Sequence, residues 1–190
     1  GAEGKDFMTG WEGRDVLIGG GGADQIWGDG GRSDTPYPDV ALEASSADSI
    51  YGGGGDDIIY AGPGDDYVDG GDGNDVITGE TGSDVIFGGD GNDSLGGQFV
   101  GINSPDTGDD YIDGGDGNDF IWGSASDDIL LGGSGDDDIR GCGGDDFIDG
   151  GDGNDRVQGN DAHGGAGDDI VIGTPGADKL YGDDGNDTLV

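Results

Sequence analysis

Aspartate recurs along this chain in the sixth place of a nine-residue unit that reads G-G-x-G-x-D-x-U-x, where U is aliphatic. Residues 70–78, Gly-Gly-Asp-Gly-Asn-Asp-Val-Ile-Thr, are a clean copy. Eighteen units align in this way, and their sixth residues are Asp6, Asp15, Asp24, Asp48, Asp57, Asp66, Asp75, Asp84, Asp93, Asp110, Asp119, Asp128, Asp137, Asp146, Asp155, Asp169, Asp178 and Asp187. Asp is a common turn residue, but 18 copies in register favour a chemical role. Because hard cations such as Ca²⁺ prefer carboxylate oxygens, that role is metal binding.

The charge balance points the same way. The 190 residues include 44 acidic and 6 basic ones, which gives a formal net charge of −38. Self-repulsion on this scale destabilises a compact state unless cations bind, so folding is expected to depend on metal. The same charge disfavours nucleic acid as a partner, because no basic surface is present to neutralise phosphates. No apolar run approaches the length of a membrane span, so membrane insertion is not expected.

Turns and short strands must position these aspartates. Glycine at the first, second and fourth places permits positive φ and close approach of the backbone to an ion. The fourth place is glycine in every unit but two, where Ser46 and Ser126 stand instead. The eighth place is aliphatic or Met throughout, and x-U-x alternates outward, inward and outward as a short strand does. Each unit is therefore predicted to be one turn and one strand. Asn or Asp in the fifth place, such as Asn74, is expected to hydrogen-bond within its turn or to add charge outside the ligand shell.

The repeat resembles the hemolysin-type calcium-binding nonapeptide of the RTX (repeats-in-toxin) family, and the resemblance covers the whole chain. It implies an all-β parallel β-roll, a β-helix or solenoid in which successive units alternate between two parallel sheets, so that 18 units make about nine coils. It also implies that each Ca²⁺ lies between turns two units apart, held by the sixth-position carboxylates of both turns and by turn backbone. The 18 aspartates are thus the expected side-chain ligands. The expected backbone contributors include Gly53, Gly55, Gly71, Gly73, Gly89, Gly91, Gly115, Gly117, Gly133, Gly135, Gly151 and Gly153.

This arrangement sets an upper limit on the number of ions. Two rows of nine turns would leave eight gaps in each row, so the chain would hold up to about 16 Ca²⁺. Their 32 positive charges would nearly cancel the net charge of −38. Such near-cancellation is what a calcium-dependent fold predicts.

Three insertions interrupt the repeat, within residues 28–51, 97–113 and 159–172. They fall six units apart, which is three coils, so all three loops are expected on one edge of the roll. The chain then reads as a single domain, 1–190, with super-repeats 1–69, 70–131 and 132–190. It starts and stops at unit boundaries without a capping segment, although repeat arrays normally need caps. This favours either a segment of a longer roll or a subunit that stacks end to end.

The outward side chains differ between the two predicted sheets. Even-numbered units place apolar residues outward, namely Val16, Ile18, Tyr51, Tyr67, Val85, Phe87, Tyr111, Ile129, Leu131, Phe147, Ile170, Ile172 and Val190. The other sheet carries Arg140, Arg156 and Lys179 among Trp27, Tyr60, Phe120 and Trp122. The apolar sheet is a second candidate for self-association. Ordinary strand propensity explains it equally well.

The sequence favours a non-enzymatic, calcium-dependent structural or adhesive roll. The alternative is an accessory module that aids secretion and folding of a larger enzyme or toxin. No catalytic constellation is found, since the one histidine, His163, stands in the third insertion near Asp161. The resemblance implies a secreted, extracellular protein, exported from a bacterium by a type I-like route. A glycan or surface partner is left open.

Overall fold

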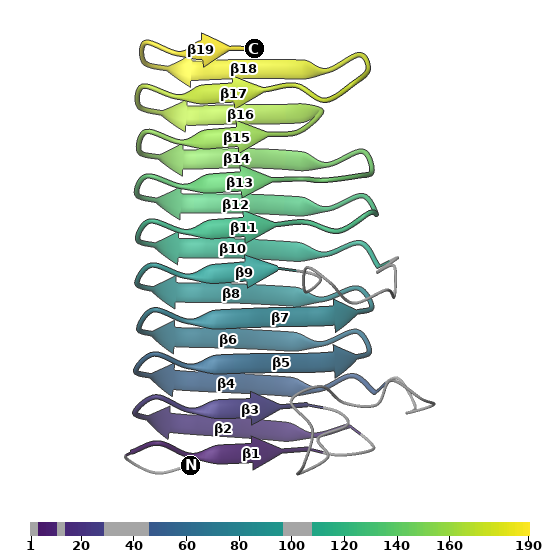
Figure 1. The fold of residues 1–190 in the computed structure, drawn as a ribbon, viewed down its shortest axis with the longest axis vertical. Helices are drawn as coiled ribbons and strands as arrows, with labels where there is room; N and C mark the ends of the chain where they lie inside the picture. Colours follow the sequence, from purple (N-terminus) through teal and green to yellow (C-terminus); the bar gives the residue numbers. More distant parts are fainter. Residues whose placement is uncertain (1–3, 11–13, 29–45, 97–107) are drawn as a thin grey trace.

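A computed structural model describes residues 4–10, 14–28, 46–96 and 108–190, and within them the chain forms nineteen strands and no helix. The strands build two parallel sheets that face each other along a solenoid (Figure 1). The predicted all-β parallel roll of about nine coils is confirmed.

Odd-numbered strands form a ten-stranded sheet and even-numbered strands a nine-stranded sheet. The ten-stranded sheet contains β1 (Phe7–Thr9), β3 (Gln25–Trp27), β5 (Ile58–Pro63), β7 (Val76–Thr81), β9 (Ser94–Gly96), β11 (Phe120–Trp122), β13 (Asp138–Arg140), β15 (Arg156–Gln158), β17 (Ile170–Ile172) and β19 (Thr188–Leu189). The nine-stranded sheet contains β2 (Val16–Gly21), β4 (Ser49–Gly54), β6 (Tyr67–Asp72), β8 (Val85–Asp90), β10 (Tyr111–Asp116), β12 (Ile129–Ser134), β14 (Phe147–Asp152), β16 (Asp161–Ala166) and β18 (Lys179–Asp184). Each strand pairs in register with the strand two further along the chain, as Ile112 of β10 does with Leu130 of β12.

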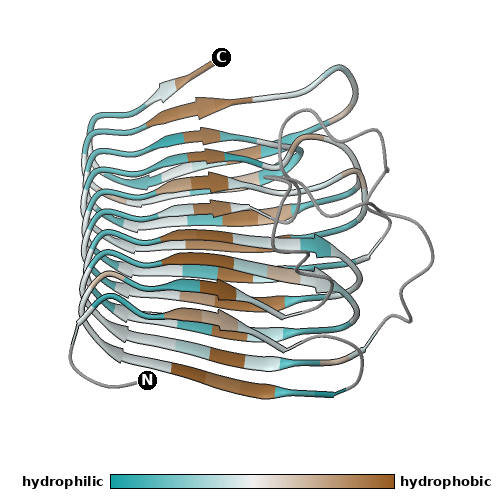
Figure 2. Ribbon diagram, turned by 60° about the horizontal axis from the view of Figure 1, so that its bottom comes forward, coloured by the Kyte–Doolittle hydropathy of each residue, from teal (hydrophilic) through white to brown (hydrophobic). Residues whose placement is uncertain are grey.

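The core is a thin column of eighth-position side chains. Each strand except β16 turns one such side chain inward, and in the middle of the roll these residues are completely buried, as Ile59, Ile121 and Ile148 show. Figure 2 shows the apolar segments stacked in the middle of the strands and hydrophilic turns along one side. Because each coil contributes only two inward side chains, hydrophobic burial is small for a chain of this length.

The roll has two edges of turns, which we name by their contents. The plain edge, at the left in Figure 1, consists of the segment before β1 and the turns that lead from an even to an odd strand. Their sixth-position aspartates are Asp6, Asp24, Asp57, Asp75, Asp93, Asp119, Asp137, Asp155, Asp169 and Asp187. The loop edge consists of the turns that lead from an odd to an even strand. The predicted insertions within 28–51 and 97–113 both follow odd strands, so they leave the roll at the loop edge; residues 29–45 and 97–107 themselves lie outside the described residues.

The third predicted insertion, within 159–172, is a strand and not a loop. A turn of two residues, Gly159 and Asn160, leads from β15 directly into β16, which pairs with β14 on one side and β18 on the other. Residues 159–163 therefore form a short additional unit, in which Ala162 is the buried inward residue. The sequence prediction missed it because the unit has no six-residue turn and no aspartate in the sixth place.

The extra strand transfers every later unit to the opposite sheet. The prediction placed Ile170 and Ile172 on the apolar even sheet, but they belong to β17 of the ten-stranded sheet. Val190 follows β19 on that same sheet, and its backbone amide donates a hydrogen bond to the carbonyl oxygen of Val171. Lys179, predicted to lie with Arg140, is instead in β18 of the nine-stranded sheet, where it pairs with Asp161.

Candidate calcium sites along the plain edge

Sixth-position aspartates form a continuous hydrogen-bonded row along the plain edge. The Oδ1 atom of each accepts a hydrogen bond from the backbone amide of the preceding aspartate in the row. For example, the amide of Asp57 donates to Asp75 over 2.9 Å, and that of Asp119 donates to Asp137 over 2.7 Å. The row runs without a break from Asp6 to Asp187. Each carboxylate therefore joins two coils.

The second carboxylate oxygen in this row lacks a partner. Eight Oδ2 atoms on the plain edge are buried without a hydrogen bond, those of Asp24, Asp57, Asp75, Asp93, Asp119, Asp137, Asp155 and Asp169. Buried polar atoms in proteins are nearly always satisfied, and a buried anionic oxygen is especially costly. Such a row of buried anionic oxygens fits a bound cation between successive coils.

The electrostatics of the row agree with this conclusion. Burial, assisted by neighbouring carboxylates, raises the pKa of Asp75 and Asp155 to about 6 and that of Asp93 and Asp137 to about 7. Loss of hydration and repulsion between stacked carboxylates both disfavour the charged form. A divalent cation between two carboxylates would remove both penalties, and Ca²⁺ suits an all-oxygen environment.

Turn glycines bring the backbone of successive coils into close contact. The φ angles of Gly71 and Gly73 are +105° and +142°. A Cβ atom on Gly71 would lie 2.0 Å from the carbonyl oxygen of Gly53 in the preceding coil. All twelve turn glycines predicted from the sequence have φ between +102° and +151°, and all twelve lie on the plain edge. These turns therefore have the compact backbone that the predicted coordination of Ca²⁺ by turn carbonyl groups requires.

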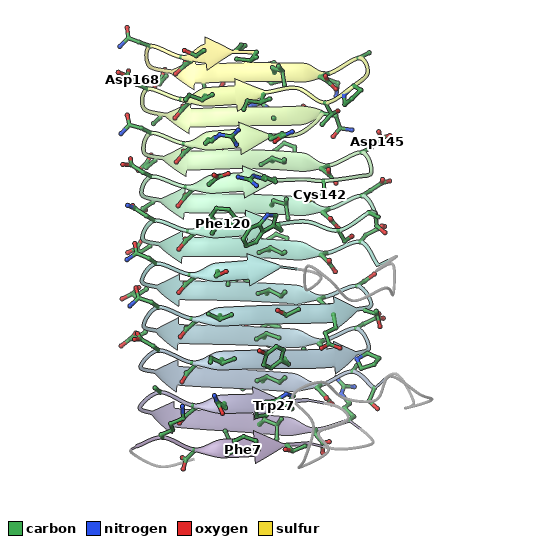
Figure 3. The ribbon with its side chains drawn as sticks, in the orientation of Figure 1. Phe7, Trp27, Phe120, Cys142, Asp145 and Asp168 are labelled. Atoms are coloured by element: carbon green, nitrogen blue, oxygen red, sulfur yellow. The ribbon has the colours of Figure 1, made fainter. Side chains whose placement is uncertain are left out.

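Fifth-position residues form a second, exposed row outside the first. The amide of Asn92 donates to Oδ1 of Asn74, and the amide of Asn154 donates to Oδ1 of Asp136. These bonds join neighbouring turns, so the prediction of hydrogen bonds within a turn was wrong. Hydrogen bonds from Asn154 lower the pKa of Asp136, which keeps this outer carboxylate charged. Asp168 belongs to the same outer row, and Asp145 lies at the opposite edge (Figure 3).

The loop edge carries a similar row of sixth-position aspartates on less regular turns. Amide-to-carboxylate hydrogen bonds connect Asp15, Asp48, Asp66, Asp84, Asp110, Asp128 and Asp146. The second place of the turn, however, is Glu80, Ser124 or Cys142 in three of these turns, with φ of +81° at Glu80 and +74° at Cys142. The Oδ2 atom of Asp128 accepts a 2.6 Å hydrogen bond from the amide of Ser124 in its own turn. The loop edge thus matches the repeat pattern only in part.

Within the described ranges, no three His, Cys, Asp or Glu side chains gather into a metal-binding cluster. An ion on the plain edge would therefore take two consecutive carboxylates and complete its shell with turn carbonyls. His163 lies away from the rows on the nine-stranded sheet, between Asp161 and Asp183, and stacks on Tyr181 with ring centroids 4.3 Å apart. It is part of a surface charge cluster that includes Asp183, the second residue of the last plain-edge turn.

Two facing parallel sheets, turns rich in glycine and a row of stacked carboxylates define a parallel β-roll of the calcium-binding type. The chain belongs to the family of the RTX calcium-binding nonapeptide repeat, whose family model matches residues 1–33, 44–77, 69–98, 105–139, 131–162 and 163–190. Ca²⁺ binding follows from this membership. Domains of this family are typically non-catalytic and characteristic of secreted bacterial proteins.

A search of curated proteins finds no match to the chain. In the part of the chain that the structure describes, no helix is long and apolar enough to cross a membrane.

Proposed function

We propose that this chain is a calcium-dependent extracellular structural or adhesive roll, in which ions along the plain edge hold successive coils together. The row of eight buried, unpartnered Oδ2 atoms carries the proposal. Bound Ca²⁺ would supply the charge that lets stacked carboxylates stay ionised. The aspartates would orient their Oδ2 atoms toward the ion while their Oδ1 atoms keep the coils in register.

The proposal gives calcium a direct role in folding. The net charge of −38 makes the metal-free chain repel itself, and the thin core buries too little apolar surface to offset this repulsion. Binding to the folded state alone stabilises that state in proportion to the logarithm of ion concentration. In low calcium the chain would be an expanded coil that fits a secretion channel, and at millimolar extracellular calcium it would fold.

Circular dichroism tests this function. Titration of metal-free protein with Ca²⁺ should convert a coil spectrum into a β spectrum, and a chelator should reverse the change. Mg²⁺ at the same concentration should be much less effective, because it demands a smaller octahedral shell and dehydrates reluctantly. A β spectrum that persists in excess chelator at neutral pH would refute calcium-dependent folding.

The nine-stranded face is the surface on which we propose contact between copies of the roll. Tyr51, Tyr67, Phe87 and Tyr111 form a continuous aromatic row there, with neighbouring ring centroids 5.7 to 5.8 Å apart. The ten-stranded face has a shorter aromatic row, Phe7, Trp27 and Tyr60, and an ion-pair cluster of Arg140 and Arg156 with Asp138. Copies that each carry the full negative charge repel, so association should require calcium.

Electron microscopy and sedimentation at high protein and calcium concentrations distinguish the candidate roles. Filaments or oligomers support the structural role, whether copies meet end to end or through the nine-stranded face. A strictly monomeric roll that raises the refolding yield of a neighbouring enzyme or toxin domain in calcium would instead support the accessory role.

A further inference from the structure

We propose that the side-chain amide of Asn160 takes the place of a calcium ion on the loop edge, so that the gap between the turn at residues 141–146 and the next turn holds no ion. This inference rests on the proposed calcium-dependent assembly of the roll. It concerns one position at which the chain departs from the repeat pattern.

Asn160 occupies the place of a sixth-position aspartate in the row. Its Oδ1 atom accepts a 2.8 Å hydrogen bond from the amide of Asp146, as an aspartate would at that position. Its Nδ2 group donates to the carbonyl oxygen of Gly144 over 3.0 Å and to Oδ1 of Asp145 over 3.1 Å. Two donors thus face turn oxygens, where an aspartate would present a second anionic oxygen.

The plain edge at the same height in the roll provides the contrast. There the amide of Asp155 donates to Oδ1 of Asp169 over 2.8 Å, and Oδ2 of Asp169 is buried without a hydrogen bond. That oxygen needs a cation. At Asn160 the neutral amide brings partial positive charge to the turn oxygens and adds no carboxylate, so the need for a cation is removed.

The length of the turn supports the same conclusion. Gly159 and Asn160 replace a six-residue turn, so the glycine-rich arc that supplies backbone on the plain edge is missing. The chain here passes directly over the core, because a Cβ atom on Gly159 would lie 2.4 Å from Cδ1 of Ile148. The short turn therefore offers an ion neither a carboxylate nor an arc of carbonyl groups.

The two edges should consequently bind different numbers of ions. Ten aspartates on the plain edge leave nine gaps. Seven connected aspartates on the loop edge leave six gaps before the row reaches Asn160. The upper limit becomes 9 + 6 = 15 ions, unevenly distributed, in place of two equal rows.

The test compares Asn160→Ala with Asn154→Ala. Asn154 is a matched control, because its Nδ2 also donates to an aspartate, Asp136, and its Oδ1 also accepts a backbone amide, from Asp168. At saturating calcium, Asn160→Ala should lower the thermal midpoint by about 2–4 °C more than the control, since turn oxygens lose their donors. Native mass spectrometry should count as many bound ions in Asn160→Ala as in the wild type.

Loss of one ion in Asn160→Ala, or a midpoint equal to that of the control, would overturn the inference. If the variant does not fold, anomalous diffraction from calcium-bound wild-type crystals decides the question. Peaks between successive plain-edge turns and none between Asp146 and Asn160 are expected, and a peak at the latter position contradicts the proposal. Failure of the proposed function is a separate outcome, visible as a wild-type roll that folds without calcium.

Discussion

The backbone amide of Asp75 donates a 2.8 Å hydrogen bond to Oδ1 of Asp93 in the next coil, while Oδ2 of the same Asp93 carboxylate is buried without a hydrogen bond. One side chain thus connects two coils and also presents a charged oxygen to an ion. The two roles belong to different atoms, so an isosteric substitution can separate them.

Asp93→Asn should weaken calcium binding while leaving the coil register intact. The amide oxygen can still accept from Asp75, but the charge available to an ion is lost. Because calcium affinity depends on the number of charged ligands, the apparent affinity should fall on the order of tenfold, with reduced cooperativity. Calorimetric or spectroscopic calcium titration measures this. Asp56→Asn, in the exposed outer row, is the control, and equal losses in the two variants would contradict a specific role for Asp93.

Without calcium, the folded fraction of the chain should be larger in mild acid than at neutral pH, where the expanded coil is expected. Burial raises the folded-state pKa of Asp75, Asp93 and Asp137 from 3.8 to about 6 or 7. Between about pH 4 and pH 7 the folded state therefore binds more protons than the unfolded state, and the free energy of unfolding falls as pH rises.

Calcium should reverse this pH dependence, because protons compete with the ion for the same oxygens. Far-UV circular dichroism across this pH window, with and without calcium, measures the folded fraction. A metal-free folded fraction that increases from about pH 4 to pH 7 would show that the buried carboxylates are not the dominant titrating groups.

Gly71→Ala should disrupt the roll, whereas Gly54→Ala should be nearly neutral. The φ angle of Gly71 is +105°, and an added Cβ would meet the Gly53 carbonyl oxygen at 2.0 Å. A cost of at least about 2 kcal/mol is expected from the backbone conformation and the overlap together. At Gly54 the nearest atom to an added Cβ is 4.0 Å away. Denaturant unfolding in saturating calcium compares the two, and equal stabilities would show that the coils can separate without penalty.

Ile121→Ala should cost roughly 2–5 kcal/mol even when calcium is saturating. Ile121 is completely buried in the central column, and its neighbours above and below cannot collapse into the cavity without breaking sheet register. Val76→Ala is the control, because Val76 points outward and is 37% exposed. If both variants unfold at the same denaturant concentration, ions and not the core determine the stability of folded coils.

The sequence was sufficient to predict the fold, because the alternation of inward aliphatic residues and turn glycines repeats with little variation. It also predicted the aspartates that line both edges. The register of Ile112 with Leu130 follows directly from the nine-residue period.

The additional strand β16 could not be predicted from that period, since Gly159 and Asn160 replace a whole turn. A weak signal was present: Asp161-Ala162-His163 has the x-U-x pattern and precedes Gly164-Gly165. The contrast between the edges was also visible, because the second place is glycine in most units of one series, with Ala2 and Asp183 as exceptions, whereas the other series includes Glu80, Ser124 and Cys142. Whether a fifth-position side chain bonds within its own turn or to the neighbouring turn, as Asn74 does to the amide of Asn92, depends on backbone orientation. The sequence carries no signal for that choice.

The five-residue unit at 159–163 also bears on how such a surface evolves. Its single strand changes the parity of every unit that follows, so Ile170 and Ile172 face one side of the solenoid with the segment and the other side without it. Gain or loss of fifteen nucleotides would thus exchange the outward residues of all later coils while leaving their inward column intact. A repeat protein of this kind can acquire a new face by one short insertion, with no substitution at any exposed position.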